Sequence, residues 1–280
     1  MNTKAIIFSL SAGAAALIAA GVYMTKPGTY DPEIAEPFNR RYFAHRGLHK
    51  EDKSVPENTL AAFGLAADKG YGMELDVQMT KDKVCVVFHD GDLKRIFGID
   101  KNVSDFTLDE LKELDIYGTG ERIPTFKEML DLVGGRTPLI VELKPETGKK
   151  RVELCMEVLA LLRDYREKTG GDFCVESFDP FIVKWFRKNA PDLFRGQLTM
   201  PAKNYDHKIP FLARLSMSLC LYNFAAKPHF IAYFNKKPSP ILGLAKVLGA
   251  KAVAWTSRTP GDSPGADAII FEFYEPEQRF

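Results

Sequence analysis

The chain has 280 residues, 45% of them hydrophobic, and a formal net charge of +1 from 38 basic and 37 acidic side chains. This length fits one large domain or two small ones with a substantial core. The balanced charge and the lack of a basic stripe exclude a protein that binds nucleic acid through a broad electrostatic field. The four cysteines lie far apart and mostly in apolar runs, which favours buried free thiols over disulfides or a Cys/His metal site (Cys85, Cys155, Cys174 and Cys220).

The N-terminal segment carries the first strong signal. No charged residue occurs between Ala5 and Met24, and Lys4 and Lys26 bracket this run. A helix of this length rises about 30 Å, the thickness of a bilayer core. We therefore expect a transmembrane anchor over residues 1–26 and a single-pass membrane protein, with the positive-inside rule placing the following domain outside the cytoplasm. A cleaved signal peptide is the alternative, although cleavage at the small residues would leave an apolar stretch behind.

Residues 27–40 are rich in proline and acidic side chains and are predicted to form a linker. Strand-like and helix-like runs alternate over residues 41–280. The expected strands are Arg41–Gly47, Met73–Met79, Val84–His89, Pro138–Lys144, Phe173–Phe178, Arg195–Thr199, His229–Phe234, Ala252–Thr256 and Ala268–Glu272. The expected helices are Glu57–Lys69, Leu108–Leu114, 126–133 (opened by a capping box), Lys149–Lys168, Pro180–Asn189 and Ile241–Leu248. About eight such units predict a closed (β/α)8 TIM barrel, with an open doubly wound sheet as the alternative.

Charged and polar residues gather where the predicted strands end, the edge at which barrel enzymes place their functional groups. These residues are His45, Arg46, Glu74, Asp76, His89, Glu142 and Lys144. Residues two apart in a strand share a face, so Glu74 and Asp76 can point into one barrel mouth. Carboxylates converging there would repel one another without a cation, and oxygen ligands suit Mg²⁺ or Ca²⁺.

Each of these residues also has a structural interpretation, such as a hydrogen-bonded histidine or an isolated ion pair. Their joint placement favours a site, because burying unpaired carboxylates would cost several kcal/mol each. His49, His207 and His229 lack this context and are interpreted as structural or surface residues. Asp90 either orients His89 or caps a turn.

Several motifs resemble, in order and spacing, those of the glycerophosphodiester phosphodiesterase family. They are HRG (45–47), PENTLAAF (56–63), ELDVQMTKD (74–82), VVFHD (86–90), VELKP (141–145), SFDP (177–180), the AWTS segment around Trp255 and GADAIIFE (265–272). The resemblance extends from about residue 41 to about residue 275. It implies a TIM barrel with a small inserted subdomain, here at about 91–122, that hydrolyses glycerophosphodiesters to glycerol phosphate and an alcohol with a divalent cation.

Carried onto this sequence, the resemblance assigns roles to nine residues. It implies general acid–base catalysis by His45 and His89, metal ligation by Glu74, Asp76 and Glu142, phosphate binding by Arg46 and Lys144, and apolar walls beside the glycerol from Phe178 and Trp255. The nucleophile is either water or the glycerol 2-hydroxyl, which would give a cyclic phosphate first. A phospholipase releasing the cyclic phosphate and a non-catalytic lipid-binding barrel are the alternative functions. No protein partner is implied.

The chain departs from the family pattern near its C-terminal end. The segment after Trp255 is too short and too rich in Pro and Gly for the seventh helix, and Phe271-Glu272 stands where the family usually has Thr-Asp. Both changes affect the expected shape of the substrate pocket. Residues 203–227 are unusually apolar and predict either a packed insertion or a membrane-facing lip. The lip would suit a membrane-lipid substrate such as a lysophospholipid.

Overall fold

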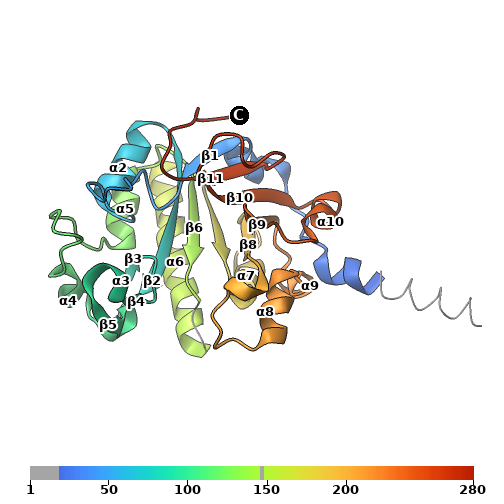
Figure 1. Ribbon diagram of the computed structural model, residues 1–280, viewed down its shortest axis with the longest axis horizontal. Coiled ribbons are helices and arrows are strands. Elements are labelled where there is room, and N and C mark those ends of the chain that lie inside the picture. Colours follow the sequence, from blue (N-terminus) through green and yellow to red (C-terminus); the bar gives the residue numbers. More distant parts are fainter. Residues whose placement is uncertain (1–18, 146–147) are drawn as a thin grey trace, which may run out of the picture.

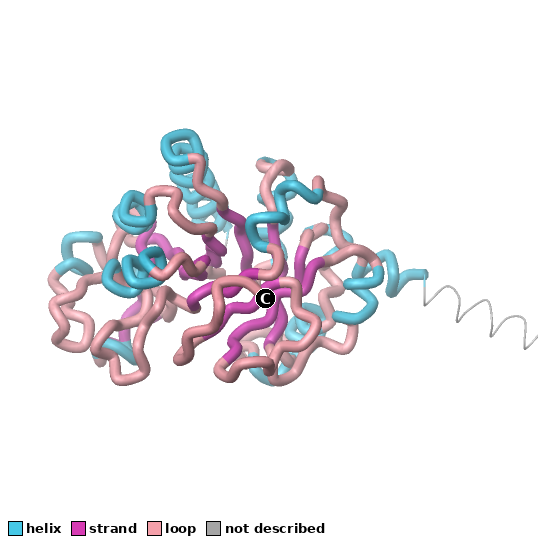
Figure 2. Tube along the Cα trace, turned by 90° about the horizontal axis from the view of Figure 1, so that it is seen from above, coloured by secondary structure: helices cyan, strands magenta, loops and turns pink. Residues whose placement is uncertain are grey.

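The computed structural model describes residues 19–145 and 148–280. Eight parallel strands close into a TIM-type barrel in the order β1-β11-β10-β9-β8-β7-β6-β2, with β1 pairing to β2 (Figures 1 and 2). The strands are β1 (Arg41–Ala44), β2 (Gly72–Met79), β6 (Leu139–Leu143), β7 (Phe173–Ser177), β8 (Arg195–Thr199), β9 (Phe230–Phe234), β10 (Lys251–Ser257) and β11 (Ala268–Phe271). The short β3 (Cys85–Val87) adds to β2 in the antiparallel direction. The predicted barrel is confirmed, and the open sheet is excluded.

Helices surround the strands, as Figure 2 shows from above. They include α2 (Leu60–Asp68), α5 (Phe126–Val133), α6 (Gly148–Thr169), α7 (Pro180–Asn189) and α10 (Leu242–Val247). Their apolar faces bury Phe63, Phe126 and Phe186 against the outside of the barrel. Each such ring contributes about 2–3 kcal/mol of burial free energy. The expected capping box at the start of α5 is present, with Thr125 Oγ1 accepting from the Glu128 N–H at 3.1 Å.

The barrel interior has an apolar lower layer and a polar upper layer. Ile140 and Glu142 lie two residues apart on β6 and therefore on the same face, and Cys174 and Glu176 repeat the pattern on β7. The lower residues of each pair join a buried apolar cluster, and the upper residues are carboxyls. In each pair the two side chains face the barrel interior, and the carboxyl comes second. The polar groups therefore lie near the carboxyl end of the barrel.

Residues 27–40 differ from the predicted linker. The 3-10 helix η1 (Pro32–Phe38) packs under the barrel, where the Phe38 ring stacks on Phe43 and Phe194 at centroid distances of 6.0 and 5.5 Å. The preceding chain is also attached, because Asn223 Nδ2 donates to the Thr25 carbonyl at 3.1 Å. Residues 27–40 are therefore part of the folded domain, because their aromatic side chains pack against the apolar end of the barrel.

The predicted membrane localisation is corrected by the structure. Within residues 19–145 and 148–280, none of the helices is long and apolar enough to span a bilayer. The prediction of a single-pass membrane protein is therefore wrong for the described residues. Most of the predicted anchor, residues 1–18, lies outside the described residues.

The segment at about 91–122 forms a small unit with its own core beside β3. It contains β4 (Asp92–Leu93), α3 (Lys94–Phe97), β5 (Ile99–Asn102), η2 (Val103–Asp105) and α4 (Leu108–Lys112). Val103, Leu111 and Ile116 are buried in that core together with Phe88, the residue that follows β3. This packing fixes the unit next to the segment that carries His89.

The structure also describes the apolar segment 203–227 and the short connection after Trp255. Residues 203–227, expected to form a packed insertion or a membrane-facing lip, contain α8 (Phe211–Ser218) and α9 (Asn223–Ala226) after η3 (Ala202–Asn204). Phe211 and Leu212 on α8 are 60% and 75% exposed, so the helix buries only part of its apolar surface. Between β10 and β11 the chain runs through turns without a helix, as the short spacing indicates.

Candidate active site

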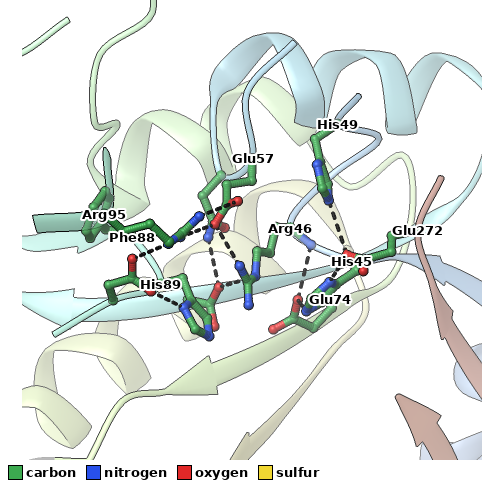
Figure 3. A network of polar contacts seen from close by, with 12 residues as sticks. His45, Arg46, His49, Glu57, Glu74, Phe88, His89, Arg95 and Glu272 are labelled. Carbon is green, nitrogen blue, oxygen red and sulfur yellow. Dashed lines mark hydrogen bonds and ion pairs between the residues drawn. The ribbon is translucent and has the colours of Figure 1, made fainter. Parts of the chain in front are cut away.

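The predicted polar residues meet at the carboxyl end of the barrel (Figure 3). His45 and Arg46 follow β1, Glu74 and Asp76 lie on β2, and His89 follows β3. The parallel register places Asp76 of β2 beside Glu142 of β6. Barrel closure therefore brings together residues almost a hundred positions apart in the sequence.

Glu74, Asp76 and Glu142 form a buried carboxylate cluster, with one oxygen of each within 4.8 Å of the others. Burial and repulsion from its two neighbours raise the pKa of Glu74 well above its ordinary value. Burial likewise raises the pKa of Glu142 to about 7. Burial opposes the ionised form of Asp76 too, but Lys144, His89 and Arg46 outweigh it and hold the pKa of Asp76 well below its usual range.

This cluster fits a hard divalent cation. Three carboxylates offer only oxygen donors, and their mutual repulsion makes a positive charge between them favourable. The chain supplies part of that charge, because Lys144 Nζ lies 2.6 Å from Asp76 Oδ1 and 2.8 Å from Glu142 Oε1. A fourth carboxyl, Glu176, lies beside Glu142 in the register with its pKa raised well above normal by burial. The position of Glu176 near the end of the predicted strand Phe173–Phe178 was the signal that could have identified it.

His45 is held by a carboxylate that sequence reasoning noted only as a departure from the family. Its Nδ1 lies 2.8 Å from Glu272 Oε2, and Glu272 Oε1 accepts from Arg258 Nε at 2.6 Å. An Nδ1–H donated to Glu272 leaves Nε2 unprotonated, 3.9 Å from Glu74. Burial and then the Arg46 charge lower the pKa of His45 to about 4, although Glu272 opposes this. The placement of Glu272 directly after the last barrel strand was the signal that could have identified it.

His89 has a matching arrangement on the other side. Its Nδ1 lies 2.6 Å from Asp90 Oδ1, so Asp90 orients the imidazole. Asp90 Oδ2 accepts from Arg95 Nε at 2.5 Å. Burial opposes ionisation of Asp90, but His89 and Arg95 lower the pKa of Asp90 to about 2. Burial and the Lys144 charge lower the pKa of His89.

Arg46 is fixed by the residues that follow it. Its Nη1 donates to Glu57 Oε1 at 2.7 Å, and its Nε lies 3.5 Å from Asp76 Oδ2. Asn58 donates to the same Asp76 oxygen at 2.8 Å. Gly47 has a φ of 77°, and a Cβ there would approach the Ala62 backbone to 2.8 Å. The HRG and PENT motifs thus act together to place one guanidinium and one carboxylate.

The two predicted wall residues also meet. The rings of Phe178 and Trp255 pack edge to face at a centroid distance of 5.6 Å, and both lie against the apolar cluster inside the barrel. A cleft of about 990 Å³ opens beside His89 and Lys144, and its other lining residues come largely from the 91–122 unit. The site therefore offers an aromatic surface and a polar cleft.

Of the three remaining histidines, two lie away from the site and one contacts it. His229 is buried among Tyr30 and Phe194, and His207 is exposed beside Arg214, as expected for structural and surface residues. His49 is different, because its Nε2 lies 3.5 Å from Glu272 Oε2. His45, His49 and Glu272 could geometrically hold a metal. We interpret them instead as a hydrogen-bonded set, because both Glu272 oxygens already accept bonds.

Comparison with known proteins agrees with this geometry. The model of the glycerophosphoryl diester phosphodiesterase family matches residues 45–274. A glycerophosphodiester phosphodiesterase of Caldanaerobacter subterraneus subsp. tengcongensis is 33% identical over 84% of this chain and 93% of its own length. A putative glycerophosphodiester phosphodiesterase of Bacillus subtilis is 38% identical over 82% of this chain and 93% of its own.

Solved structures give the same result. A putative glycerophosphoryl diester phosphodiesterase from Silicibacter pomeroyi has a TM-score of 0.67 and 27% identity, covering 88% of this chain and 91% of its own. The predicted resemblance is confirmed by these matches, which extend over nearly all of the barrel. The chain belongs to the glycerophosphoryl diester phosphodiesterase family.

Proposed function

We propose that this protein hydrolyses glycerophosphodiesters to glycerol phosphate and an alcohol. The observation that carries the proposal is a pair of histidines, each held through Nδ1 by a carboxylate, beside one cluster of three acidic residues. The family match and the two bacterial relatives, both named as glycerophosphodiester phosphodiesterases, support the substrate class.

The histidines carry the proton transfers in this proposal. With its Nδ1 proton on Glu272, His45 presents Nε2 as a site that can accept a proton. His89 is held by Asp90 in the same way and is about one-third exposed, so its ring reaches the open cleft. One imidazole takes the proton of the nucleophile, and the other donates a proton to the departing alkoxide. The protons balance over one turnover, because the histidine that gained a proton releases one to water and the histidine that lost a proton takes one up before the next substrate binds.

Arg46 and Lys144 bind and orient the phosphate in this proposal. The planar guanidinium of Arg46 is fixed by Glu57 and suits two phosphate oxygens, and Lys144 adds a point charge. Glu74, Asp76 and Glu142 would hold the divalent cation. When bound, that cation would neutralise charge on the phosphoryl group. Phe178 and Trp255 would pack against the glycerol carbons.

A lysophospholipid is the second candidate substrate. The exposed Phe211 and Leu212 on α8 provide an apolar surface that could contact an acyl chain. A lysophospholipase D of Rattus norvegicus is 32% identical over 60% of this chain and 55% of its own length. The polar cleft beside His89 favours a diester with a polar alcohol instead, so the soluble glycerophosphodiester remains the first candidate.

A substrate panel tests both candidates. The intact chain would be assayed with glycerophosphocholine and with lysophosphatidylcholine, each with added Mg²⁺ or Ca²⁺, and products would be identified by mass. We expect faster turnover of the soluble diester and glycerol phosphate as the final product. Preference for the lysophospholipid would reverse the ranking, and a cyclic phosphate as the final product would favour the phospholipase alternative. A protein that turns over neither substrate would refute the proposal.

A further inference from the structure

Arg95 is a charged residue outside the barrel that contacts two parts of the site at once (Figure 3). It lies on α3 of the 91–122 unit, and its side chain is 43% exposed. Its Nε donates to Asp90 Oδ2 at 2.5 Å. Its other two nitrogens donate to the two oxygens of Glu57, at 2.6 and 3.0 Å. A single guanidinium therefore makes three charge-assisted hydrogen bonds to two carboxylates.

Each of these carboxylates has a second partner in the site. Asp90 holds the His89 ring at 2.6 Å, and Glu57 holds the Arg46 guanidinium at 2.7 Å. The resulting chain of contacts runs from His89 through Asp90, Arg95 and Glu57 to Arg46. We propose that Arg95 is a positioning residue that sets the His89 imidazole and the Arg46 guanidinium relative to each other. This inference rests on the proposed function, in which one group transfers a proton and the other binds phosphate.

The electrostatics support a role beyond that of a surface ion pair. Burial opposes ionisation of Glu57, but Arg95 and Arg46 lower the pKa of Glu57 to about 2. Both carboxylates therefore stay charged and keep their bonds over the range in which enzymes work. An isolated exposed ion pair contributes little to stability, whereas a bidentate contact within a network also fixes the geometry of its partners. Lysine could not replace Arg95, since one ammonium cannot donate in the same fork to two carboxylates.

The arrangement behind His45 differs from the arrangement behind His89. His45 is held by Glu272, and Glu272 is held by Arg258. The Arg258 guanidinium directs both Nε and Nη2 to the same oxygen of Glu272. Arg258 thus supports one carboxylate, whereas Arg95 joins two. The 91–122 unit is consequently more than a wall of the cleft, because its first helix carries the group that couples two functions.

The test compares Arg95→Ala and Arg95→Lys with Arg122→Ala. Arg122 is a matched control, since it lies at the end of the same unit, is 39% exposed and pairs with Asp115 at 2.9 Å. With glycerophosphocholine, both Arg95 variants should lower kcat/KM by about tenfold or more, with kcat reduced and KM raised together. Asp90→Asn should lower mainly kcat, and Glu57→Gln should raise mainly KM. Arg122→Ala should have the same activity as the unchanged protein. Both Arg122→Ala and Arg95→Ala should show only a small shift in melting temperature.

Two further measurements separate positioning from folding. Added guanidinium ion should restore part of the activity of Arg95→Ala and none of that of Arg95→Lys. The ¹⁵N resonances of the His89 ring should change in Arg95→Ala and stay unchanged in Arg122→Ala, a result that needs no turnover. Equal kinetics and equal His89 spectra for the Arg95 and Arg122 variants would overturn the inference. Loss of turnover in the unchanged protein would instead overturn the proposed function and leave the spectra to decide the role of Arg95.

Discussion

Replacing Glu272 by Gln changes the charge behind His45 with little change in shape. In the structure the Glu272 carboxylate accepts from His45 Nδ1 at 2.8 Å and from Arg258 Nε at 2.6 Å. A Gln side chain can still accept one hydrogen bond from the imidazole, but it carries no charge to stabilise the imidazolium. We therefore expect a loss of catalysis without a loss of fold.

The size of the effect follows from the two kinds of hydrogen bond. A bond to a charged group contributes about 1.5–3 kcal/mol, and a neutral one about 0.5–1.5 kcal/mol. The midpoints of these ranges differ by about 1.3 kcal/mol, which corresponds to roughly a tenfold decrease in kcat. The ion pair that Arg258 loses is worth under about 1 kcal/mol, because the Arg258 side chain is 57% exposed. The melting temperature should consequently change by only a few degrees.

Steady-state hydrolysis of glycerophosphocholine, with thermal unfolding of the same samples, measures both quantities. Glu275→Gln is the control, since Glu275 is an exposed glutamate that pairs with Lys69 away from the histidines. Glu272 raises the pKa of His45, so its loss should also move the acidic limb of the activity profile to lower pH. A kcat within about twofold of the control would refute the reasoning.

Three further predictions concern His89 and the buried carboxyls. His89→Ala should lower kcat by about a hundredfold or more with little change in melting temperature, because the ring is partly exposed. Burial raises the pKa of Glu142 to about 7, and burial with repulsion raises that of Glu74. These groups lose protons as pH rises, so the rise in melting temperature on adding Mg²⁺ or Ca²⁺ should grow from about pH 6 to about pH 8, and a flat response would contradict this. Burial raises the pKa of Glu176 in the folded protein. The protonated Glu176 therefore contributes fully to stability below the unfolded pKa of about 4.3, and this contribution is lost as the pH rises toward the folded pKa. Urea unfolding should therefore show Glu176→Gln gaining stability over the unchanged protein as pH rises, whereas a pH-independent difference would contradict the burial argument.

The barrel and the main groups of the proposed site were predictable because their signals are local. Strand periodicity places Glu74 and Asp76 on one face, and the end of a parallel strand in a barrel is where functional groups gather. The partners of these groups were not predictable in the same way. Glu272 lies 227 positions from His45, and only barrel closure brings them together. Arg95 lies on a four-residue helix whose sequence does not indicate where its side chain reaches.

Two segments differ from their predicted structure for physical reasons. Proline and acidic residues suggested a linker before the barrel, but composition does not show that Phe38 and Tyr30 fit the apolar floor of the barrel. The membrane prediction rested on the length of an uncharged run, and no helix in the described part of the chain meets the requirement for a bilayer span. The apolar residues of 203–227 were correctly noticed, yet their arrangement in α8 and α9 depends on packing against neighbouring elements.

The most direct test of the central claim follows glycerophosphocholine by ³¹P NMR. The intact chain, first treated with a chelator, would be compared with His45→Ala before and after adding Mg²⁺ or Ca²⁺. We predict no conversion in the chelator, stoichiometric formation of glycerol phosphate by the unchanged protein once the cation is added, and a rate about a thousandfold lower for His45→Ala. An unchanged signal in the presence of cation, or equal rates for the two proteins, would contradict the account.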